Sequence, residues 1–548
     1  MDKGKNFIEQ IIDEDLSSGF DSSKLQFRFP PEPNGFLHIG HVKAIVLNFE
    51  LAKKYKAKIN LRFDDTNPEN EDQIYIDAIK QDISWLGYKW DKECYASDYF
   101  DTLHDWAVDL IKKDKAYIDS QTSSEIAAQK GTPTEPGTES PFRNRPIEES
   151  LDIFSKMKNG DFEQGKHVLR AKISMTSSNM LMRDPVIYRA LDSHHPRTKD
   201  KWKIYPMYDW THGESDYIEQ VSHSLCTLEF EPHRELYDWF LDAISPLKGI
   251  RPKQREFSRL NLSYTITSKR KLALLVEENM VDGWDDPRMP TISGLRKRGY
   301  TPESLKNFAL TVGISKRENV IDASLLEFCI RTHLNQIAPR AMAVLDPIKI
   351  RIINYKIEGG EKINFDINPQ EKELGTREIS FSNELYIENE DFQEDPEEGF
   401  FRLSIGEEVR LKNAYIVRAV ELVKNEKGKI EEVLCEYDSK SRSGSNTPES
   451  NRKVKGTIHW VSAKDSIKAK VNIYDRLFKV PEPGKSGDLK NEVNKNSLEV
   501  RDAFVEPYLA ESLEAQQFQF QRLGYFVRTN NKKTLEFNKT VGLRDSWK

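Results

Sequence analysis

Apolar and polar residues alternate over residues 25–29, and this period of two predicts a strand. From Ile39 to Phe49 the apolar residues recur at steps of three and four, which predicts a helix. The Pro-rich stretch between them contains Asn34-Gly35 and predicts a turn. We therefore expect the N-terminal region to run from a strand through a turn into a helix.

A second strand is predicted at residues 59–63, and a one-sided apolar helix that closes at Gly87 follows it. In α/β sheets, ligands bind at the carboxyl ends of the strands. Asp64, directly after this strand, is therefore a candidate to bind a substrate ammonium group. The alternative is that Asp64 only caps the following helix.

The strand–helix rhythm breaks at about Tyr99. Residues 99–203 hold an amphipathic helix and a Gly-, Pro- and Thr-rich loop with Arg143 and Arg145, so we expect an insertion in the nucleotide fold. Residues 204–209 then resume a strand-like composition, and we expect them near the active site. The pattern from residue 272 to about 335 is helical.

Beyond Arg340, short strands at close spacing without long helices predict β-barrels. We expect these strands at residues 348–352, 409–411, 415–417 and 454–461. The Ser/Gly/Asn-rich segment 438–452 is expected to be a flexible hairpin tip. Together the patterns predict an α/β nucleotide fold that is split by an insertion and followed by all-β domains.

Length and composition favour a soluble protein of several domains. The 548 residues exceed what one core holds, so we expect three to five domains. No apolar run approaches the ~20 residues of a membrane span, and the polar, acidic N-terminus does not read as a signal peptide. The four cysteines are scattered without a CxxC pair, which argues for a reducing compartment and against structural zinc. We therefore expect a cytoplasmic protein without membrane contact.

The net charge of −7 by itself points away from nucleic acid. Attraction to phosphate depends on local clusters of cations, however, and the chain has 82 Lys and Arg residues. The charge therefore predicts a divided surface with basic stripes and acidic faces.

His38 and His41 lie three residues apart in the first turn of the predicted helix, on one face. The helix dipole and the unpaired N–H groups favour an anion there, and Gly40 lets a ligand approach the backbone closely. The turn therefore predicts a site for a nucleoside triphosphate. Two alternatives are a zinc site, which lacks a third ligand nearby, and a pair of histidines that only cap the helix.

Residues 266–272, Ile-Thr-Ser-Lys-Arg-Lys-Leu, form a cationic segment after a strand-like stretch at 260–266. Three cations beside a hydroxyl suit a mobile loop that neutralises charge on a transferring phosphoryl group. The alternative is a solvated charge run. The combination of this segment with the histidine turn resembles the paired HIGH and KMSKS signatures of class I aminoacyl-tRNA synthetases.

The resemblance narrows to the glutaminyl/glutamyl branch of that class, and within it to the bacterial glutaminyl enzymes, from about residue 24 to the C-terminus. The motifs that carry it are residues 29–41, 61–68, 205–209, 268–271, 281–288, 338–343 and 537–545. The β-barrel pattern agrees with this choice, because the common bacterial glutamyl enzymes resemble one another in a helical anticodon region instead.

The resemblance implies six segments. They are a Rossmann-like catalytic domain in two parts (24–98 and 204–271, the second with the KMSKS-like loop), an acceptor-stem-binding insertion (99–203), a helical subdomain (272–336) and two anticodon-binding β-barrels (337–455 and 456–548). The implied partners are ATP with Mg²⁺, L-glutamine and tRNA(Gln), with no structural metal, and a monomer is expected. The implied activity is ligation of glutamine to the 2′-hydroxyl of the terminal adenosine, with a glutamyl enzyme of the β-barrel type as the alternative.

The resemblance also assigns site residues. Catalysis falls to His38, His41, Ser268 and Lys269. ATP is expected against Glu32, Pro33, Asn34, His38, Ile39, Gly40, His41, Val42, Lys43, Ala44, Thr227, Arg259, Leu260, Thr267, Ser268 and Lys269. Glutamine is expected against Arg28, Asp64, Tyr208, Cys226 and Gln254, and tRNA against Lys316, Arg317, Asn319, Arg340, Arg402, Arg410, Gln519 and Arg522.

Cys226 carries the argument for glutamine. A γ-carboxylate in a dry pocket needs a compensating cation, whereas an amide needs one donor and one acceptor. Glutamyl members tend to place a cation where this chain has Cys226, so the pocket is expected to prefer the amide, which can exchange hydrogen bonds with Tyr208. The alternative for Cys226 is an ordinary buried cysteine.

Some positions depart from the family pattern. Ile266, Thr267 and Arg270 stand where the general class signature has Lys, Met and Ser. Pro232 and Phe401 replace residues that face the acceptor stem and the wobble base in some relatives, so neither contact is implied. Two other classes stay open, a small nucleotidyltransferase with an HxGH turn and a non-catalytic RNA-binding paralogue. The first lacks such a β-rich C-terminal half, and the second would have lost active-site residues.

Overall fold

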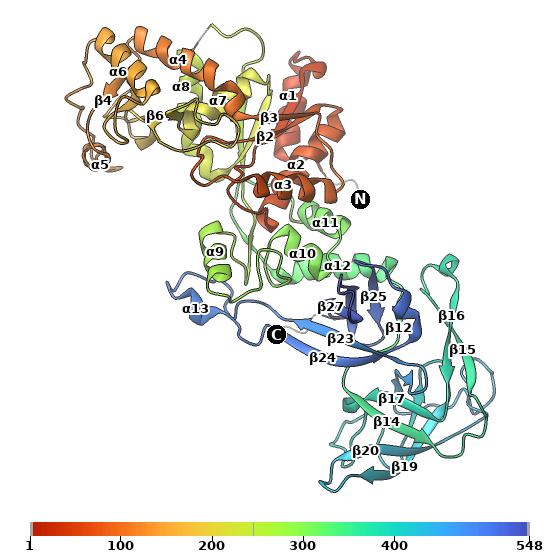
Figure 1. Ribbon diagram of the computed structural model, residues 1–548. Helices are drawn as coiled ribbons and strands as arrows, with labels where there is room; N and C mark the ends of the chain where they lie inside the picture. Colours follow the sequence, from red (N-terminus) through yellow and green to blue (C-terminus); the bar gives the residue numbers. More distant parts are fainter. Residues whose placement is uncertain (1–3, 245, 545–548) are drawn as a thin grey trace. The chain divides into compact units, whose positions relative to one another are not determined.

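The computed structural model describes residues 4–244 and 246–544, and the chain divides into two compact units. Unit 1 comprises Met1–Asn261 and Ala309–Ile321, and unit 2 comprises Leu262–Phe308 and Asp322–Lys548. Figure 1 gives the element labels used below. Among the described residues, no helix combines the length and the apolar character that crossing a bilayer requires.

The N-terminal part of unit 1 has the predicted strand–turn–helix order. β1 (Gln26–Phe29), β2 (Lys58–Phe63) and β3 (Lys92–Tyr95) pair in parallel in the order β1-β2-β3. α2 (Ile39–Tyr55) and α3 (Gln73–Trp85) follow the first two strands, as their apolar periodicity predicted. The carboxyl ends of β1 and β2 therefore meet at one edge, where α2 begins.

A second parallel pair completes this region. β8 (His223–Thr227) pairs with β9 (Lys253–Phe257), and Ser222, just before β8, donates its backbone N–H to the carbonyl of Gln26 in β1 at 3.0 Å. Helices α1 (Phe7–Ser17), α7 (Tyr208–Ile218) and α8 (Arg234–Ala243) belong to the same unit. These contacts bring residues from β1 and β8 together although about 200 positions separate them in the sequence.

The segment predicted as an insertion forms its own four-stranded antiparallel sheet. Its order is β4-β5-β6-β7. The elements are β4 (Ala116–Asp119), β5 (Val168–Ala171), β6 (Val186–Ala190) and β7 (Ile204–Pro206), with helices α4 (Phe100–Lys112), α5 (Ser123–Gln129) and α6 (Ile147–Asn159). The strand-like composition of residues 204–209 corresponds to β7, which pairs antiparallel with β6, while residue 208 already begins α7. Alternation identifies a strand but not its partner.

Unit 2 begins with a group of helices. They are α9 (Lys269–Glu277), α10 (Ile292–Arg298) and α12 (Ala323–Ile337), and α11 (Pro302–Val312) crosses the boundary between the units. A strand was expected over residues 260–266, but only β10 (Asn261–Leu262) forms. Ile266 instead packs in a small core with Leu272 and Leu275 of α9.

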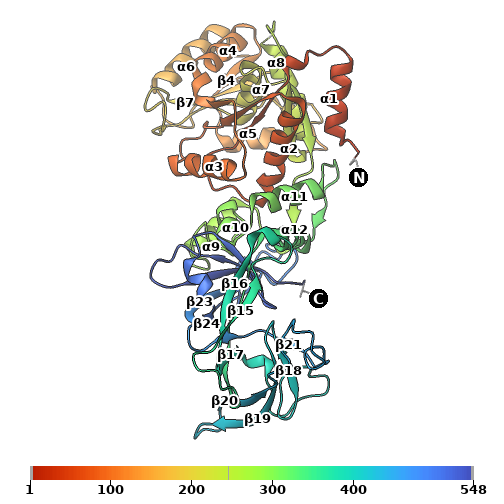
Figure 2. The ribbon, with the colours of Figure 1, turned by 90° about the vertical axis from the view of Figure 1, so that its right-hand side faces the viewer.

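Two seven-stranded sheets make up the β-rich part of unit 2 (Figure 2). The first has the order β21-β18-β19-β20-β14-β17-β22, with bounds Thr457–Ile458, Glu408–Leu411, Ile416–Lys424, Ile430–Tyr437, Pro347–Ile352, Glu384–Glu388 and Val461–Ser462. The second has the order β12-β25-β26-β27-β23-β24-β13, with bounds Arg340–Ala341, Gln517–Phe520, Gly524–Arg528, Glu536–Val541, Ile467–Tyr474, Leu498–Val505 and Ala343–Val344. β15 (Glu361–Asp366) and β16 (Thr376–Phe381) form a separate antiparallel ribbon, and α13 (Leu489–Glu492) is one turn.

The predicted fold class is confirmed, with local corrections. The strand expected over 454–461 is broken into the short β21 and β22. The segment 438–452 is not a loose hairpin tip, because Ser441 within it is fully buried and Arg410 donates to the carbonyls of Ser441 and Ser450. A composition rich in small polar residues therefore formed hydrogen-bonded turns that a neighbouring strand stabilises.

Candidate active site and anticodon surface

The histidine turn is the N-terminal cap of α2. His38 is the N-cap residue, and its Nδ1 accepts a hydrogen bond from the backbone N–H of Gly40 at 3.1 Å. The backbone N–H of His38 donates to Nδ1 of His41, also at 3.1 Å. Since both Nδ1 atoms are acceptors, a neutral ring at either position carries its proton on Nε2. Both histidines therefore take part in the N-terminal cap of α2 through their Nδ1 atoms.

Lys43 was expected to contact ATP, but it lies buried one turn further along α2. Its Nζ donates to the carbonyl oxygen of Ser258 at 2.6 Å and to the Ser258 hydroxyl at 3.0 Å. Burial lowers the pKa of Lys43 to about 8. Lys43 therefore holds the segment that precedes Arg259 and Leu260, two other residues expected near ATP.

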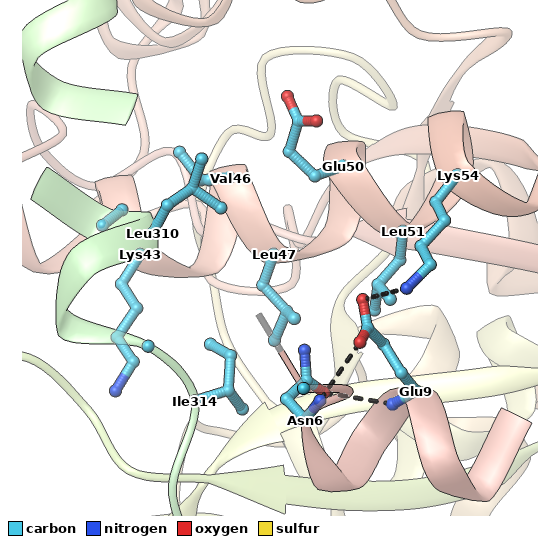
Figure 3. A pocket seen from close by; sticks show the side chains of 13 residues that line it. Asn6, Glu9, Lys43, Val46, Leu47, Glu50, Leu51, Lys54, Leu310 and Ile314 are labelled. Carbon is cyan, nitrogen blue, oxygen red and sulfur yellow. Dashed lines mark hydrogen bonds and ion pairs between the residues drawn. The ribbon is translucent and has the colours of Figure 1, made fainter. Parts of the chain in front are cut away.

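Lys43 also lines a cavity of about 370 Å³ along α2 (Figure 3). Val46, Leu47 and Leu51 contribute apolar walls, and Glu9 pairs with Lys54 at 2.7 Å on one side. The ATP residues expected at Val42 and Ala44 lie on the same helix, and Val42 is completely buried.

Three further ATP candidates lie where β8 and β9 end. Thr227 donates its hydroxyl to Glu229 at 2.8 Å, and Arg259 is half-exposed between Glu229 and Glu318 at 3.6 to 3.8 Å. Leu260 is buried. In the turn before α2, the carbonyl of Pro33 accepts the backbone N–H of Asp72 at 3.2 Å, so this turn is tied to the start of α3.

Arg28 at the carboxyl end of β1 is the centre of a buried polar cluster. Its Nη2 lies 2.7 Å from Nε2 of His212, 2.8 Å from the Ser224 hydroxyl and 3.6 Å from the Cys226 sulfur. Its Nε donates to Asp216 at 2.9 Å. β1, α7 and β8 thus bring Arg28 and Cys226 together. His212, Ser224 and Asp216 were not anticipated.

Two carboxylates compensate the two arginines of this cluster. Asp216 also binds Arg62 at 2.8 Å, and Arg62 lies 3.2 Å from Glu219. Burial opposes ionisation of each arginine, but the attraction of Asp216 outweighs it and holds the pKa of Arg28 above its ordinary value. Burial lowers the pKa of His212 to about 3, so its ring is neutral. Two guanidinium groups therefore face two carboxylates beside a neutral histidine.

Asp64 does not cap a helix. The N-cap of α3 is Asp72, whose side chain accepts the backbone N–H of Ile74 at 3.0 Å, so that alternative is wrong. Asp64 accepts the Thr66 hydroxyl at 3.1 Å. Burial raises the pKa of Asp64 to about 6, although Arg62 acts to lower it. A cationic ligand would stabilise the ionised form of this buried carboxyl, because a nearby positive charge lowers its pKa toward the ordinary value.

Asp64, Tyr208 and His212 line one small cavity of about 10 Å³. The rings of Tyr208 and His212 stack at 5.2 Å, and Tyr208 packs on Phe230 at 5.4 Å. Gln254 donates to the carbonyl of Phe230 at 2.8 Å, so it holds the residue against which Tyr208 packs. The spacing of four between Tyr208 and His212 is the signal that could have identified His212, since residues i and i+4 share a helix face.

The cationic segment belongs to unit 2, and the structure alters its expected form. Ser268 is the N-cap of α9, and residues 269–271 form its first helical turn instead of a loop. Lys271 donates to the carbonyl of Gly484 at 3.0 Å. Cations at a helix N-terminus oppose the helix dipole, so this turn has a net attraction for an anion.

Comparison with known proteins decides the family. Residues 24–336 match the family described as tRNA synthetases class I (E and Q), catalytic domain. Residues 338–438 and 457–529 match two anti-codon binding domains of the same class. The chain belongs to the class I glutamyl- and glutaminyl-tRNA synthetase family.

Curated relatives match this synthetase over nearly its full length. Glutamine–tRNA ligase of Vibrio vulnificus (strain YJ016) is 53% identical over 546 residues, which cover 99% of this chain and 97% of that protein. Glutamine–tRNA ligase of Escherichia coli O157:H7 is 51% identical over 546 residues, with 99% and 98% covered. A solved glutamate tRNA ligase from Elizabethkingia meningosepticum aligns with 18% identity and a TM-score of 0.43 over 58% of this chain and 70% of that chain, a similarity too low to bear on function.

The RNA-binding candidates of this synthetase fall in both units. Lys316, Arg317 and Asn319 are exposed in the segment 309–321 of unit 1. In unit 2, Arg340 is nearly buried and donates to the carbonyls of Ala338 and Asn335.

The other candidates of unit 2 also make internal contacts. Gln519 donates to the Tyr525 hydroxyl at 2.9 Å. Arg402 and Arg522 both bind the fully buried Asp391. Arg410 holds the segment 438–452 by hydrogen bonds, as described above, so its guanidinium has a structural role whether or not it contacts RNA.

Proposed function

We propose that this synthetase is a glutamine–tRNA ligase that activates L-glutamine with Mg²⁺-ATP and transfers it to the 2′-hydroxyl of the terminal adenosine of tRNA(Gln). The relatives named Glutamine–tRNA ligase support this assignment at 51–53% identity. The single structural observation that carries the specificity is the balanced charge of the cluster around Arg28 and Cys226.

The physical reason is the cost of an unpaired charge. The γ-carboxylate of glutamate would enter a pocket in which Asp216 and Glu219 already compensate both arginines. An uncompensated buried charge costs several kcal/mol, at least about 3. The neutral amide of glutamine avoids this cost, and the hydroxyl of Tyr208 can act as donor or acceptor toward it.

The chemistry requires no protein nucleophile. The α-carboxylate of glutamine attacks the α-phosphorus of ATP, pyrophosphate leaves, and the 2′-hydroxyl then attacks the carbonyl carbon and releases AMP. Asp64 would bind the α-ammonium group, since its carboxyl gains from a nearby cation. His38 and His41 would donate their Nε2–H groups to phosphate oxygens.

Ser268 and Lys269 would approach the same phosphates during activation. Their place at the start of α9 supports this role, because helix dipole and side-chain charge both attract an anion there. Mg²⁺ would enter as part of the nucleotide substrate. The two C-terminal sheets would bind the anticodon loop and the segment 99–203 the acceptor stem, in a monomeric, cytoplasmic enzyme.

Parallel aminoacylation assays test the assignment. tRNA(Gln) and tRNA(Glu) transcripts are each incubated with labelled glutamine or labelled glutamate, ATP and the full chain. We expect charging only of tRNA(Gln) with glutamine. Charging of either tRNA with glutamate would overturn the proposed specificity, and no charging at all would overturn the proposed activity.

A further inference from the structure

Phe401 is a large apolar side chain that unit 2 exposes to solvent. Its exposed fraction is 62%, whereas Tyr415 and Trp460, which belong to the apolar core around the first seven-stranded sheet, are buried. A single exposed phenylalanine is not unusual by itself. The contacts of the neighbouring residues distinguish Phe401 from such a side chain.

Arg402 follows Phe401 in the chain, and one buried carboxylate, that of Asp391, holds both Arg402 and Arg522. Arg402 donates its Nε to Asp391 Oδ1 at 2.9 Å. Arg522, in the turn between β25 and β26, donates two nitrogens to the same carboxylate at 2.6 and 2.7 Å. Asp391 is fully buried, whereas the Arg402 side chain is 40% exposed and the Arg522 side chain 27%.

Arg522 adopts a backbone φ of +69°, a conformation that non-glycine residues rarely take. Such a conformation persists only where the surrounding contacts maintain it, and it is frequent at functional sites. Here the two hydrogen bonds to Asp391 and the contact with Nδ1 of His459 at 3.1 Å supply those contacts. The guanidinium groups are thus placed before any ligand arrives.

The backbone of Phe401 is held as well. Arg402 Nη1 donates to the carbonyl of Phe401 at 3.2 Å, and residues 392 and 403 form a β-bridge. Gly456 lies so close that a β-carbon there would approach the Phe401 carbonyl oxygen to 2.6 Å. A fixed backbone loses little conformational entropy when a ligand contacts the ring.

We propose that Phe401 is a stacking platform for one unpaired nucleobase of the anticodon loop, and that Asp391 is the positioning residue for Arg402 and Arg522 beside it. Single-stranded RNA is recognised by stacking of splayed bases on aromatic rings and arginine planes, with hydrogen bonds to the base edges. Phe401 supplies the exposed ring, and the guanidinium groups that Asp391 holds supply the hydrogen-bond donors. The inference rests on the proposed function, because it requires that the anticodon loop reaches this surface.

Fluorescence of 2-aminopurine tests the stacking directly. The base is placed singly at each anticodon-loop position of a tRNA(Gln) transcript, and binding to the full chain is titrated. We expect quenching at one position for the unchanged chain. Phe401→Tyr should keep the quenching, whereas Phe401→Ala should lose it and weaken binding roughly 5- to 100-fold, the range for removal of one base–aromatic stack.

Phe328→Ala is the matched control. Phe328 in α12 is also a phenylalanine of unit 2, with an exposed fraction of 57%. Its replacement should leave quenching and affinity unchanged. The slope of log Kd against log salt should remain the same in Phe401→Ala, because the phenyl ring makes no phosphate contact.

The outcomes separate this inference from the proposed function. Charging of tRNA(Gln) with unchanged affinity and quenching in Phe401→Ala would overturn the stacking platform alone. An equal loss of affinity in Phe328→Ala would overturn it too, since the effect would then be a general one of exposed rings. Failure of the unchanged chain to charge tRNA(Gln) would overturn the proposed function first.

Discussion

Replacement of Asp216 by asparagine removes one charge from the buried cluster and keeps its shape. Oδ1 of Asp216 lies 2.9 Å from Arg28 and 2.8 Å from Arg62. At an effective dielectric constant of about 20, each pair has a gross attraction of about 6 kcal/mol. In addition, Oδ2 accepts hydrogen bonds from the hydroxyls of Ser224 and Tyr237 at 2.6 and 3.0 Å, and an amide nitrogen there would face these donors.

The net loss is smaller than the gross attraction because burial of the carboxylate already costs free energy. Breaking a buried pair by removal of one partner typically costs about 3–5 kcal/mol. We expect this loss in the local stability of α7 and β1, measured by amide hydrogen exchange of the full chain. Asp238→Asn is the control, since Asp238 pairs with Arg251 on the surface at 3.3 Å and should lose less than about 1 kcal/mol.

The same change tests the origin of specificity. With Asp216 neutral, one guanidinium charge near Cys226 is no longer compensated, so glutamate gains relative to glutamine. We expect the ratio of kcat/KM for glutamine over glutamate to fall by at least about 10-fold, or 1.4 kcal/mol. An Asp216→Asn enzyme that folds and retains the full preference for glutamine would refute the argument from balanced charge.

Three further predictions follow from the described contacts. His38→Asn keeps a good N-cap but lacks the Nε2–H group, so thermal stability should change by less than about 1 kcal/mol while the rate of adenylate formation falls. Lys269→Ala should lower adenylate formation by about 10²–10³-fold, and unchanged pyrophosphate exchange would contradict its assigned role. Glu214 in α7 is fully buried, and neither of its carboxylate oxygens has a hydrogen-bond partner among the described residues. Burial raises the pKa of Glu214 well above its ordinary value, so the folded state keeps a proton that the unfolded chain releases above about pH 4.3, and stability should fall by about 1.4 kcal/mol per pH unit from there. Urea unfolding at pH 5 and pH 8 should show a smaller loss of stability in Glu214→Gln than in the unchanged chain.

Local periodicity predicted the elements around the histidine turn well. The strands near residues 26–29 and 58–63 and the helices that follow them have one apolar face each, and short-range sterics suffice to define them. The same reasoning recognised the strand at residues 204–206 but not its partner, because the partner of a strand depends on long-range pairing. It also missed that helix α9 begins at residue 269, since a run of cations obscured the N-cap at Ser268.

The sequence identified those site residues that lie close together in one segment of the chain. The spacing of His38 and His41 identified them as site candidates, and the place of Asp64 directly after a strand identified it. The partner of Arg28 could not be predicted in this way, because Asp216 lies 188 positions away and a buried salt bridge leaves no periodic pattern. The compensation of both arginines by carboxylates is therefore apparent only in the folded chain.

The course of the chain between the two units affects how the protein is made. Unit 1 is not complete at Asn261, because residues Ala309–Ile321 return to it after an excursion into unit 2. At a synthesis rate of about 5–20 residues per second, the last 60 residues up to Ile321 take about 3–12 s to appear. During this interval the nascent catalytic unit lacks the segment that lines the cavity beside α2 with Leu310 and Ile314, which leaves those apolar walls open to chaperones. A fragment that ends at a single truncation point therefore cannot contain all of unit 1 without also containing part of unit 2.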